Sequence, residues 1–288
     1  MSALLHVTIL DVVAAESNPV PSRVEAAYVA LYRATSLADR PGIVLAEEDL
    51  PAVDNISGSR SRSHDLIADL EGAGRLRPVR RGAYVLVDPG GNVRVDILEL
   101  IAALSPKPHL ITAGRALQFH GLTDQHFRLI VVLVTRQARS WSWRGEKIRY
   151  SRSSRTLTGA GVRTRRARAT IATPERALAD SLDHPQWGVT LAQVAEALDV
   201  MLTRDRAFAD RLATEVARDY GPASARRFGL LVSRLADDET ARAFLPLRGR
   251  SKAAVKLVTT GPVAGPVDPV WGVRENVDLS RLTQHRGQ

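Results

Sequence analysis

The sequence predicts an α+β fold divided between two domains. The chain has 288 residues, more than the ~100–200 residues of one ordinary domain. Apolar residues recur at helical spacing near the start and again after residue 173, whereas short apolar runs typical of strands gather between 129 and 172. Because helices and strands occupy different stretches of the larger second part, we expect them to be segregated there.

The first hundred residues predict a helix, a strand, a short helix, a third helix and a β-hairpin. Ser22 and Glu25 have the spacing of a capping box at the start of a helix over 22–37, which the breaker 39–42 ends. The third helix carries inward-facing leucine and isoleucine and stops at Gly72. The remaining elements are expected at 43–45 (strand), 47–53 (short helix), 55–58 (turn), and 76–79 with 83–87 (two strands around the tip 80–82).

This order is that of a winged helix-turn-helix, in which the helix after the turn enters the DNA major groove and the hairpin forms the wing. Arginine can bind guanine through two hydrogen bonds, and serine can bind bases or phosphates. The candidate DNA-binding residues are Ser59, Arg60, Ser61, Arg62, Ser63 and His64 on the helix, and Arg75, Arg77, Arg80 and Arg81 on the wing. There are two alternatives to DNA binding. The arginines can simply keep one face of a small domain in contact with water, or the domain can bind another protein.

We expect an N-terminal extension over 1–20, the winged helix-turn-helix over 21–98, and a larger mixed α/β C-terminal domain over 99–288. In the larger domain the patterns predict helices at 112–120, from 173, from 190, around 208–216 and around 228–235. They predict strands at 129–135, 141–150 (a strand or a hairpin), 169–172 and 271–277.

The positive charge of the chain is concentrated in one stretch. The formal net charge is +9, yet residues 101–176 carry 15 basic and 3 acidic side chains, while residues 1–100 carry 10 and 14. A GC-rich genome explains a preference for arginine over lysine, but not the scarcity of acids in this stretch alone. Such a concentration of positive charge attracts a polyanion or an acidic protein.

The candidate DNA-binding residues in this stretch are Arg139, Arg144, Lys147, Arg149, Arg152, Arg163, Arg165, Arg166 and Arg168, and the same stretch holds Arg136 and Arg155. The interleaved Trp141, Trp143 and Tyr150 are expected in the core rather than stacked on bases.

We predict no catalytic residue, no metal site and no cofactor. The chain has no cysteine, and it lacks a Walker loop, a Gly-x-Ser-x-Gly elbow and a His-Glu-x-x-His motif. Ser63, His64 and Asp65 are adjacent on a helix, so they point apart and cannot form a triad. His120 and His126 lack further ligands nearby. Lys147 directly follows Glu146, which departs from the spacing of the common nuclease signature.

Composition also predicts where the protein works. Without cysteine there is no disulfide framework, and no apolar run approaches the ~18–20 residues of a membrane span. The first fifteen residues lack the basic region of a secretory signal. We therefore expect a cytoplasmic, nucleoid-associated protein without a membrane partner.

Several short motifs resemble those of the AbiEi-type antitoxins of abortive-infection, type IV toxin–antitoxin systems. They lie in order over about 22–280 and read RRGAY (80–84), ITAGRALQFHGLT (111–123), ATPERALAD (172–180), YG (220–221) with ARRFG (225–229), and WGVRENV (271–277). The resemblance implies a protein that represses its own operon by binding inverted repeats in double-stranded promoter DNA. It also implies that the C-terminal domain counters a nucleotidyltransferase-like toxin without requiring a stable complex. The alternatives are an RNA-binding protein that uses the arginine-rich segment 136–168, and an enzyme of unrecognised type in the C-terminal domain.

Overall fold

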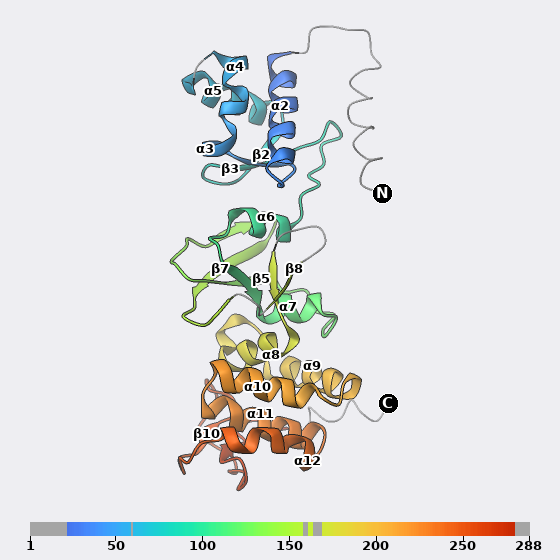
Figure 1. Ribbon diagram of the computed structural model, residues 1–288, viewed down its shortest axis with the longest axis vertical. Coiled ribbons are helices and arrows are strands. Elements are labelled where there is room, and N and C mark those ends of the chain that lie inside the picture. Colours follow the sequence, from blue (N-terminus) through green and yellow to red (C-terminus); the bar gives the residue numbers. More distant parts are fainter. Residues whose placement is uncertain (1–21, 59, 158–160, 164–168, 280–288) are drawn as a thin grey trace. The chain divides into compact units, whose positions relative to one another are not determined.

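A computed structural model describes residues 22–58, 60–157, 161–163 and 169–279. The chain divides into two compact units, residues 1–96 and 97–288, two residues from the expected boundary. Both units combine helices with β-sheets, so the fold is α+β as the sequence predicts (Figure 1). Within the described ranges no helix combines the length and the hydropathy that a membrane crossing requires.

The smaller unit is a winged helix-turn-helix. Its elements are α2 (Arg23–Leu37), β1 (Ile43–Leu45), α3 (Ala46–Asp49), α4 (Pro51–Ser57), α5 (Arg60–Gly72), β2 (Leu76–Arg80) and β3 (Ala83–Leu86). The three strands form an antiparallel sheet in the order β1-β3-β2. The Ser22 hydroxyl accepts a hydrogen bond from the Glu25 amide, so α2 begins where the capping residues predict.

The helix expected over 47–53 is in fact two helices, α3 and α4, that meet at Leu50 and Pro51. Proline has no amide hydrogen for the helical hydrogen-bond ladder, so α3 cannot continue through it, whereas proline fits the first position of a new helix. The turn expected over 55–58 shrinks to Gly58, because α4 runs on to Ser57. Gly58 has a φ of +79°, which an amino acid with a side chain rarely adopts.

The core of the smaller unit lies between α2, α4, α5 and the sheet. Leu31, Val53, Leu66 and Leu70 are completely buried, and the side chains of β1 and β3 close the cluster from the other side. The inward face of α5 therefore follows the spacing that the sequence predicts. The opposite face of α5 and the outer end of the hairpin remain in solvent.

The larger unit begins with a six-stranded mixed sheet in the order β6-β7-β5-β4-β9-β8. The elements are α6 (Ile97–Leu104), β4 (His109–Thr112), α7 (Ala113–Phe119), β5 (Leu129–Val134), β6 (Trp141–Trp143), β7 (Glu146–Arg152), β8 (Gly161–Arg163) and β9 (Thr170–Ala172). Strands β5 and β7 are parallel, as are β4 and β9, and the other neighbours are antiparallel. The segment 141–150 is thus a hairpin, and β4 and β8 are strands that the sequence analysis missed.

A helical layer follows the sheet along the chain and packs against the sheet side that carries α7, while α6 lies on the opposite side (Figure 1). Its elements are α8 (Pro174–Asp183), η1 (Pro185–Trp187), α9 (Leu191–Arg204), α10 (Phe208–Asp219), α11 (Pro222–Leu235), α12 (Asp238–Ala241) and η2 (Arg242–Leu247), and then the short parallel pair β10 (Val255–Lys256) and β11 (Val273–Arg274). Thr173 and Thr190 cap α8 and α9 as predicted. The strand expected over 271–277 is only the two residues of β11.

Candidate functional site

The first turn of α5 presents some of the predicted DNA-reading side chains, but not all of them. Arg62 and His64 are exposed. Ser63 is completely buried, so its assignment as a DNA contact was wrong. Its hydroxyl donates to Asp54 Oδ1 at 2.5 Å and lies 2.8 Å from the Ser57 hydroxyl. These contacts connect α4 with α5 across the turn. Ser59 lies outside the described residues, as do the side chains of Arg60 and Ser61.

The wing exposes arginine near its tip. Arg77 on β2 and Arg81 in the turn are exposed, and Arg80 is half-buried. Gly82 has a φ of +74° and closes the turn between the two strands. These three arginines are therefore on the part of the hairpin that the winged-helix arrangement offers to a phosphate strand.

Arg75, also predicted to bind DNA, has contacts within the smaller unit. It precedes β2 at the base of the hairpin, where its guanidinium lies 3.5 Å from the Glu25 carboxylate and 5.7 Å from the centre of the Tyr28 ring. Both partners belong to α2, so Arg75 fastens the hairpin to that helix. The Arg75 side chain remains partly exposed, and its contact with DNA stays a prediction.

The exposed face of α5 changes sign along its length. Arg62 and His64 lie near its start, whereas the exposed side chains of the following turns include Asp65 and Asp69. Carboxylates repel DNA phosphates, so only the first turn of this helix suits close approach to a duplex. Helix-turn-helix proteins contact base edges through that same turn.

The larger unit carries a second exposed basic surface on and beside the β6–β7 hairpin. The exposed cations are Arg136, Arg139, Arg144, Lys147, Arg149 and Arg152. None of these six has a carboxylate at ion-pair distance among the described residues. Arg144 and Gly145 form the hairpin turn with φ values of 47° and 84°, as a type I′ turn requires. Arg163 is on β8, but its side chain is not described, and Arg165, Arg166 and Arg168 lie outside the described residues.

The tryptophans of this hairpin belong to the core, as predicted. Trp141 and Trp143 are each 8% exposed. The Trp141 indole donates to the Tyr150 hydroxyl, which in turn lies 3.1 Å from the Ser105 hydroxyl at the end of α6. The rings are therefore unavailable for stacking on bases.

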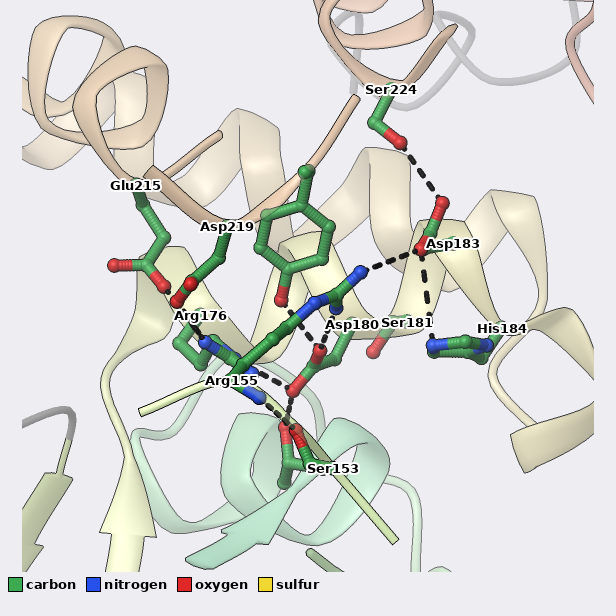
Figure 2. Close-up of polar contacts among 12 residues, drawn as sticks. Ser153, Arg155, Arg176, Asp180, Ser181, Asp183, His184, Glu215, Asp219 and Ser224 are labelled. Atoms are coloured by element: carbon green, nitrogen blue, oxygen red, sulfur yellow. Dashed lines mark hydrogen bonds and ion pairs between the residues drawn. The ribbon is translucent and has the colours of Figure 1, made fainter. Parts of the chain in front are cut away.

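Sequence reasoning missed a buried network of charges between the sheet and the helical layer (Figure 2). Asp180 on α8 is completely buried and accepts four hydrogen bonds. The donors are the Thr112 hydroxyl at the end of β4 (2.7 Å), the Tyr220 hydroxyl (2.5 Å), Arg176 Nε (3.1 Å) and Arg155 Nη1 (3.4 Å). One carboxylate thus joins the sheet, α8 and the segment that follows α10.

Arg176, one turn before Asp180, is also completely buried. Its Nη1 atom lies 2.6 Å from Asp219 and 3.4 Å from Glu215, both on α10, and its Nη2 has no hydrogen-bond partner among the described residues. Burial opposes the charge of this guanidinium, but the surrounding carboxylates outweigh that effect and raise its pKa. The pKa of Glu215 is also raised. Here burial is the cause, and it outweighs the lowering effect of Arg218 and Arg176.

Arg155 belongs to this network rather than to the exposed basic surface. Its two terminal nitrogens lie 3.4 Å from Asp180 and 3.3 Å from Asp183, and its guanidinium stacks 4.1 Å from the centre of the Tyr220 ring. Asp183 also accepts a hydrogen bond from Ser224 on α11. Carboxylates of the helical layer therefore pair with this arginine of the basic stretch. Burial, together with the Asp180 charge, raises the pKa of the Tyr220 hydroxyl well above its ordinary value.

The sequence contained one signal for this network. Arg176 and Asp180 are four residues apart on α8, and alanine or leucine occupies 177, 178, 179 and 182 between and beyond them. Apolar residues before and after Asp180 indicate that this stretch of the helix is covered. Charged residues in such a helix must be buried, and buried charges need partners.

The two histidines considered as metal ligands have separate partners. His120 Nε2 lies 2.7 Å from the Ala172 carbonyl oxygen. His126 Nε2 lies 3.6 Å from Glu146, whose carboxylate is also 3.5 Å from Arg115. In the part of the chain that the structure describes, no three metal-ligating side chains of the His, Cys, Asp and Glu types converge.

Comparison with known proteins identifies a structural neighbour. No protein-family model matches the chain, and no curated protein is similar to it. The crystal structure of the Rv2827c protein from Mycobacterium tuberculosis is similar, with a TM-score of 0.69 and 16% sequence identity. The match covers 94% of this chain and 97% of that protein. At this identity the similarity establishes a shared fold, and function has to be argued from the sites.

Proposed function

We propose that the protein is a sequence-specific DNA-binding repressor of its own operon. One observation carries the proposal: the winged-helix unit exposes cationic side chains both at the first turn of α5 and along the wing. Arg62 stands at the position from which a recognition helix reads bases, and Arg77 and Arg81 stand where a wing contacts the backbone.

The charge distribution supports a specific rather than an indiscriminate binder. The first hundred residues carry four more acidic than basic side chains, 14 against 10. Asp65 and Asp69 follow the basic first turn on the exposed face of α5. A unit with an acidic body gains little from non-specific phosphate contacts, so its affinity must come from the few cations that fit a particular site.

The proposal includes a second role, that of antitoxin in a type IV toxin–antitoxin operon. The motifs shared with AbiEi-type antitoxins support it, and the partner they imply is a nucleotidyltransferase-like toxin encoded beside this protein. In this proposal the protein neutralises the toxin without being an enzyme itself. Co-expression with the adjacent gene tests it: growth arrest by that gene alone and relief by this protein are expected, and a harmless neighbour would contradict the role.

The repressor role is tested by competition. A labelled duplex from upstream of the operon is bound by the full-length protein and then challenged with unlabelled specific duplex, random duplex and RNA, with anisotropy as the readout. Specific duplex should compete best. Equal competition by random duplex would contradict sequence specificity, and stronger competition by RNA would favour the exposed basic surface of the larger unit as an RNA site. Arg33→Ala, on the face of α2 that points away from the core, serves as the charge-matched control for variants of the interface.

A further inference from the structure

The larger unit contains a pocket where the two parallel strands β5 and β7 end. Its volume is about 220 Å³, and its lining includes Ser151, Arg152, Ser153, Ser154 and Arg155, the segment that ends β7 and continues beyond it. Leu133 of β5 closes the sheet side, and Asp180, His184 and Trp187 close the side of the helical layer. The carboxyl ends of parallel strands are a common place for ligands in sheets covered by helices.

The lining is rich in groups that bind anions. The lining includes two arginines and three serines, which are five consecutive residues. Arg152 is exposed and has no ion-pair partner among the described residues. Guanidinium binds the oxygens of phosphate in a planar, two-pronged geometry, and serine hydroxyls add donors that can rotate to suit the ligand.

Arg155 is held in place before any ligand arrives. Its guanidinium stacks on the Tyr220 ring, which does not line the pocket, and its hydrogen bonds to Asp180 and Asp183 are long, at 3.4 and 3.3 Å (Figure 2). The Arg155 amide also donates to the Ser153 hydroxyl, which shapes the loop. An arginine fixed in this way loses little side-chain freedom when it binds, which favours affinity.

The one carboxylate in the lining does not make the pocket repel anions. Asp180 receives hydrogen bonds from two guanidiniums and two hydroxyls, so its charge is already compensated. His184 stacks on Trp187 with the ring centres 4.0 Å apart, and burial lowers the pKa of this imidazole. An imidazole carries no negative charge in either protonation state, so His184 does not oppose an anion.

We propose that this pocket binds a phosphate monoester, with Arg152, Arg155 and the three serine hydroxyls around the phosphoryl oxygens. The volume is roughly seven times the ~30 Å³ that one water molecule occupies in the liquid. It accommodates the phosphate together with a small part of the molecule that carries it. The site is separate from the DNA interface proposed for the smaller unit.

The first test measures the binding of inorganic phosphate to the full-length protein by calorimetry. Saturable binding at one site is expected, and Arg152→Gln should weaken it by about tenfold or more, because charge-assisted hydrogen bonds to the phosphate can no longer form. Arg149→Gln removes the same charge from the same strand, at a residue that does not line the pocket, and should leave binding unchanged. Absence of saturable binding, or equally weakened binding in the two variants, would overturn the proposal.

The source of the phosphate is distinguished by competitors. A nucleoside monophosphate that displaces inorganic phosphate, while a 5′-phosphorylated oligonucleotide does not, assigns the pocket to a small molecule. The reverse result assigns it to the phosphorylated end of a nucleic acid. Equal displacement by the same oligonucleotide with a 5′-hydroxyl would overturn the proposal, because a phosphodiester backbone would then be sufficient. Ser154→Ala, which keeps every charge, should weaken phosphate binding several-fold, as expected when one hydrogen bond is removed.

Discussion

The Ser63 hydroxyl donates a 2.5 Å hydrogen bond to Asp54 Oδ1, nine residues earlier in the chain. Asp54 is on α4 and Ser63 is on α5, so the contact spans the turn between the two helices. A residue expected to read DNA instead holds α5 against α4 at the turn. Positioning of this helix therefore depends on buried polar atoms as well as on the apolar core.

Ser63→Ala should reduce the stability of the smaller unit rather than its base preference. The substitution leaves the half-buried Asp54 carboxylate without this donor, which costs about 1–3 kcal/mol. Urea unfolding followed by circular dichroism measures the destabilisation, and the exposed neighbour His64→Ala gives the control for α5. If Ser63→Ala instead changed the ranking of operator sequences at unaltered stability, the structural role would be refuted.

Arginines on the wing should set the salt dependence of DNA binding. Removing the exposed Arg77 and Arg81 together is expected to weaken binding to all duplexes alike. The slope of log K against log[salt] should become shallower by about 0.9 for each DNA phosphate that the variant no longer neutralises. Arg33→Ala should leave the slope unchanged, and an unchanged slope in the wing variant would contradict its binding to the DNA backbone.

Arg62 should instead govern sequence preference. Its replacement by alanine is expected to cost about 1–3 kcal/mol on the operator, because a two-pronged hydrogen bond to one base is removed, and much less on random duplex. Binding isotherms on operator duplexes with single base-pair changes measure this, because the preference should relax at one position only. Equal weakening on operator and random DNA would mean that Arg62 contacts phosphate.

The sequence predicted those elements whose signals are local. Ser22 and Thr190 mark helix starts through their own hydrogen bonds to nearby amides, so residues close in sequence suffice to find α2 and α9. The strand β4 was missed because only four residues, starting at His109, precede the helix that begins at Ala113. Such a short run gives no periodicity until the neighbouring strands pair with it.

The candidate sites were predicted less completely, since burial depends on contacts distant in sequence. Arg62 and Ser63 are adjacent residues of the same basic, serine-rich segment, yet one is exposed and the other buried. Ser63 lies at helical spacing from the buried Leu66 and Leu70, a signal that the serine-rich composition concealed. Arg155 has the sequence surroundings of the other cations in the basic stretch, but Asp180 and Asp183, more than twenty residues later, hold it in the buried network. Spacing alone cannot reveal a partner that the fold supplies.

Breaking the buried charge network should destabilise the larger unit strongly. Asp180→Asn preserves the shape of the side chain but removes the charge that compensates Arg176 and Arg155, and a buried pair broken in this way costs about 3–5 kcal/mol. Chemical denaturation monitored by tryptophan fluorescence should show the destabilisation. Asp210→Asn, at an exposed position on α10, should change stability little. Comparable effects of the two substitutions would contradict the importance of burial.

Acid should destabilise the protein through His109, a histidine that cannot be protonated without cost. Its side chain, on β4, is 3% exposed, and neither ring nitrogen has a hydrogen-bond partner among the described residues. Burial lowers its pKa from 6.5 to about 4, and the nearby Lys107 contributes to the fall. Between these two values the unfolded chain binds a proton that the folded protein does not, so stability falls as the pH drops from 6.5 to about 4 and levels off below.

A shift of this size corresponds to about 3 kcal/mol across that window. His109→Leu fills the apolar site without a titrating group, so the difference in unfolding free energy between this variant and the wild type should widen in favour of leucine as the pH falls from 6.5 to 4. Denaturation at a series of pH values measures it, and the difference also cancels the contribution of His184, whose pKa is likewise lowered by burial. His64→Leu, at an exposed position, serves as the control. A difference between His109→Leu and the wild type that stays constant over this pH range would show that the His109 imidazole is protonated as readily in the folded protein as in the unfolded chain.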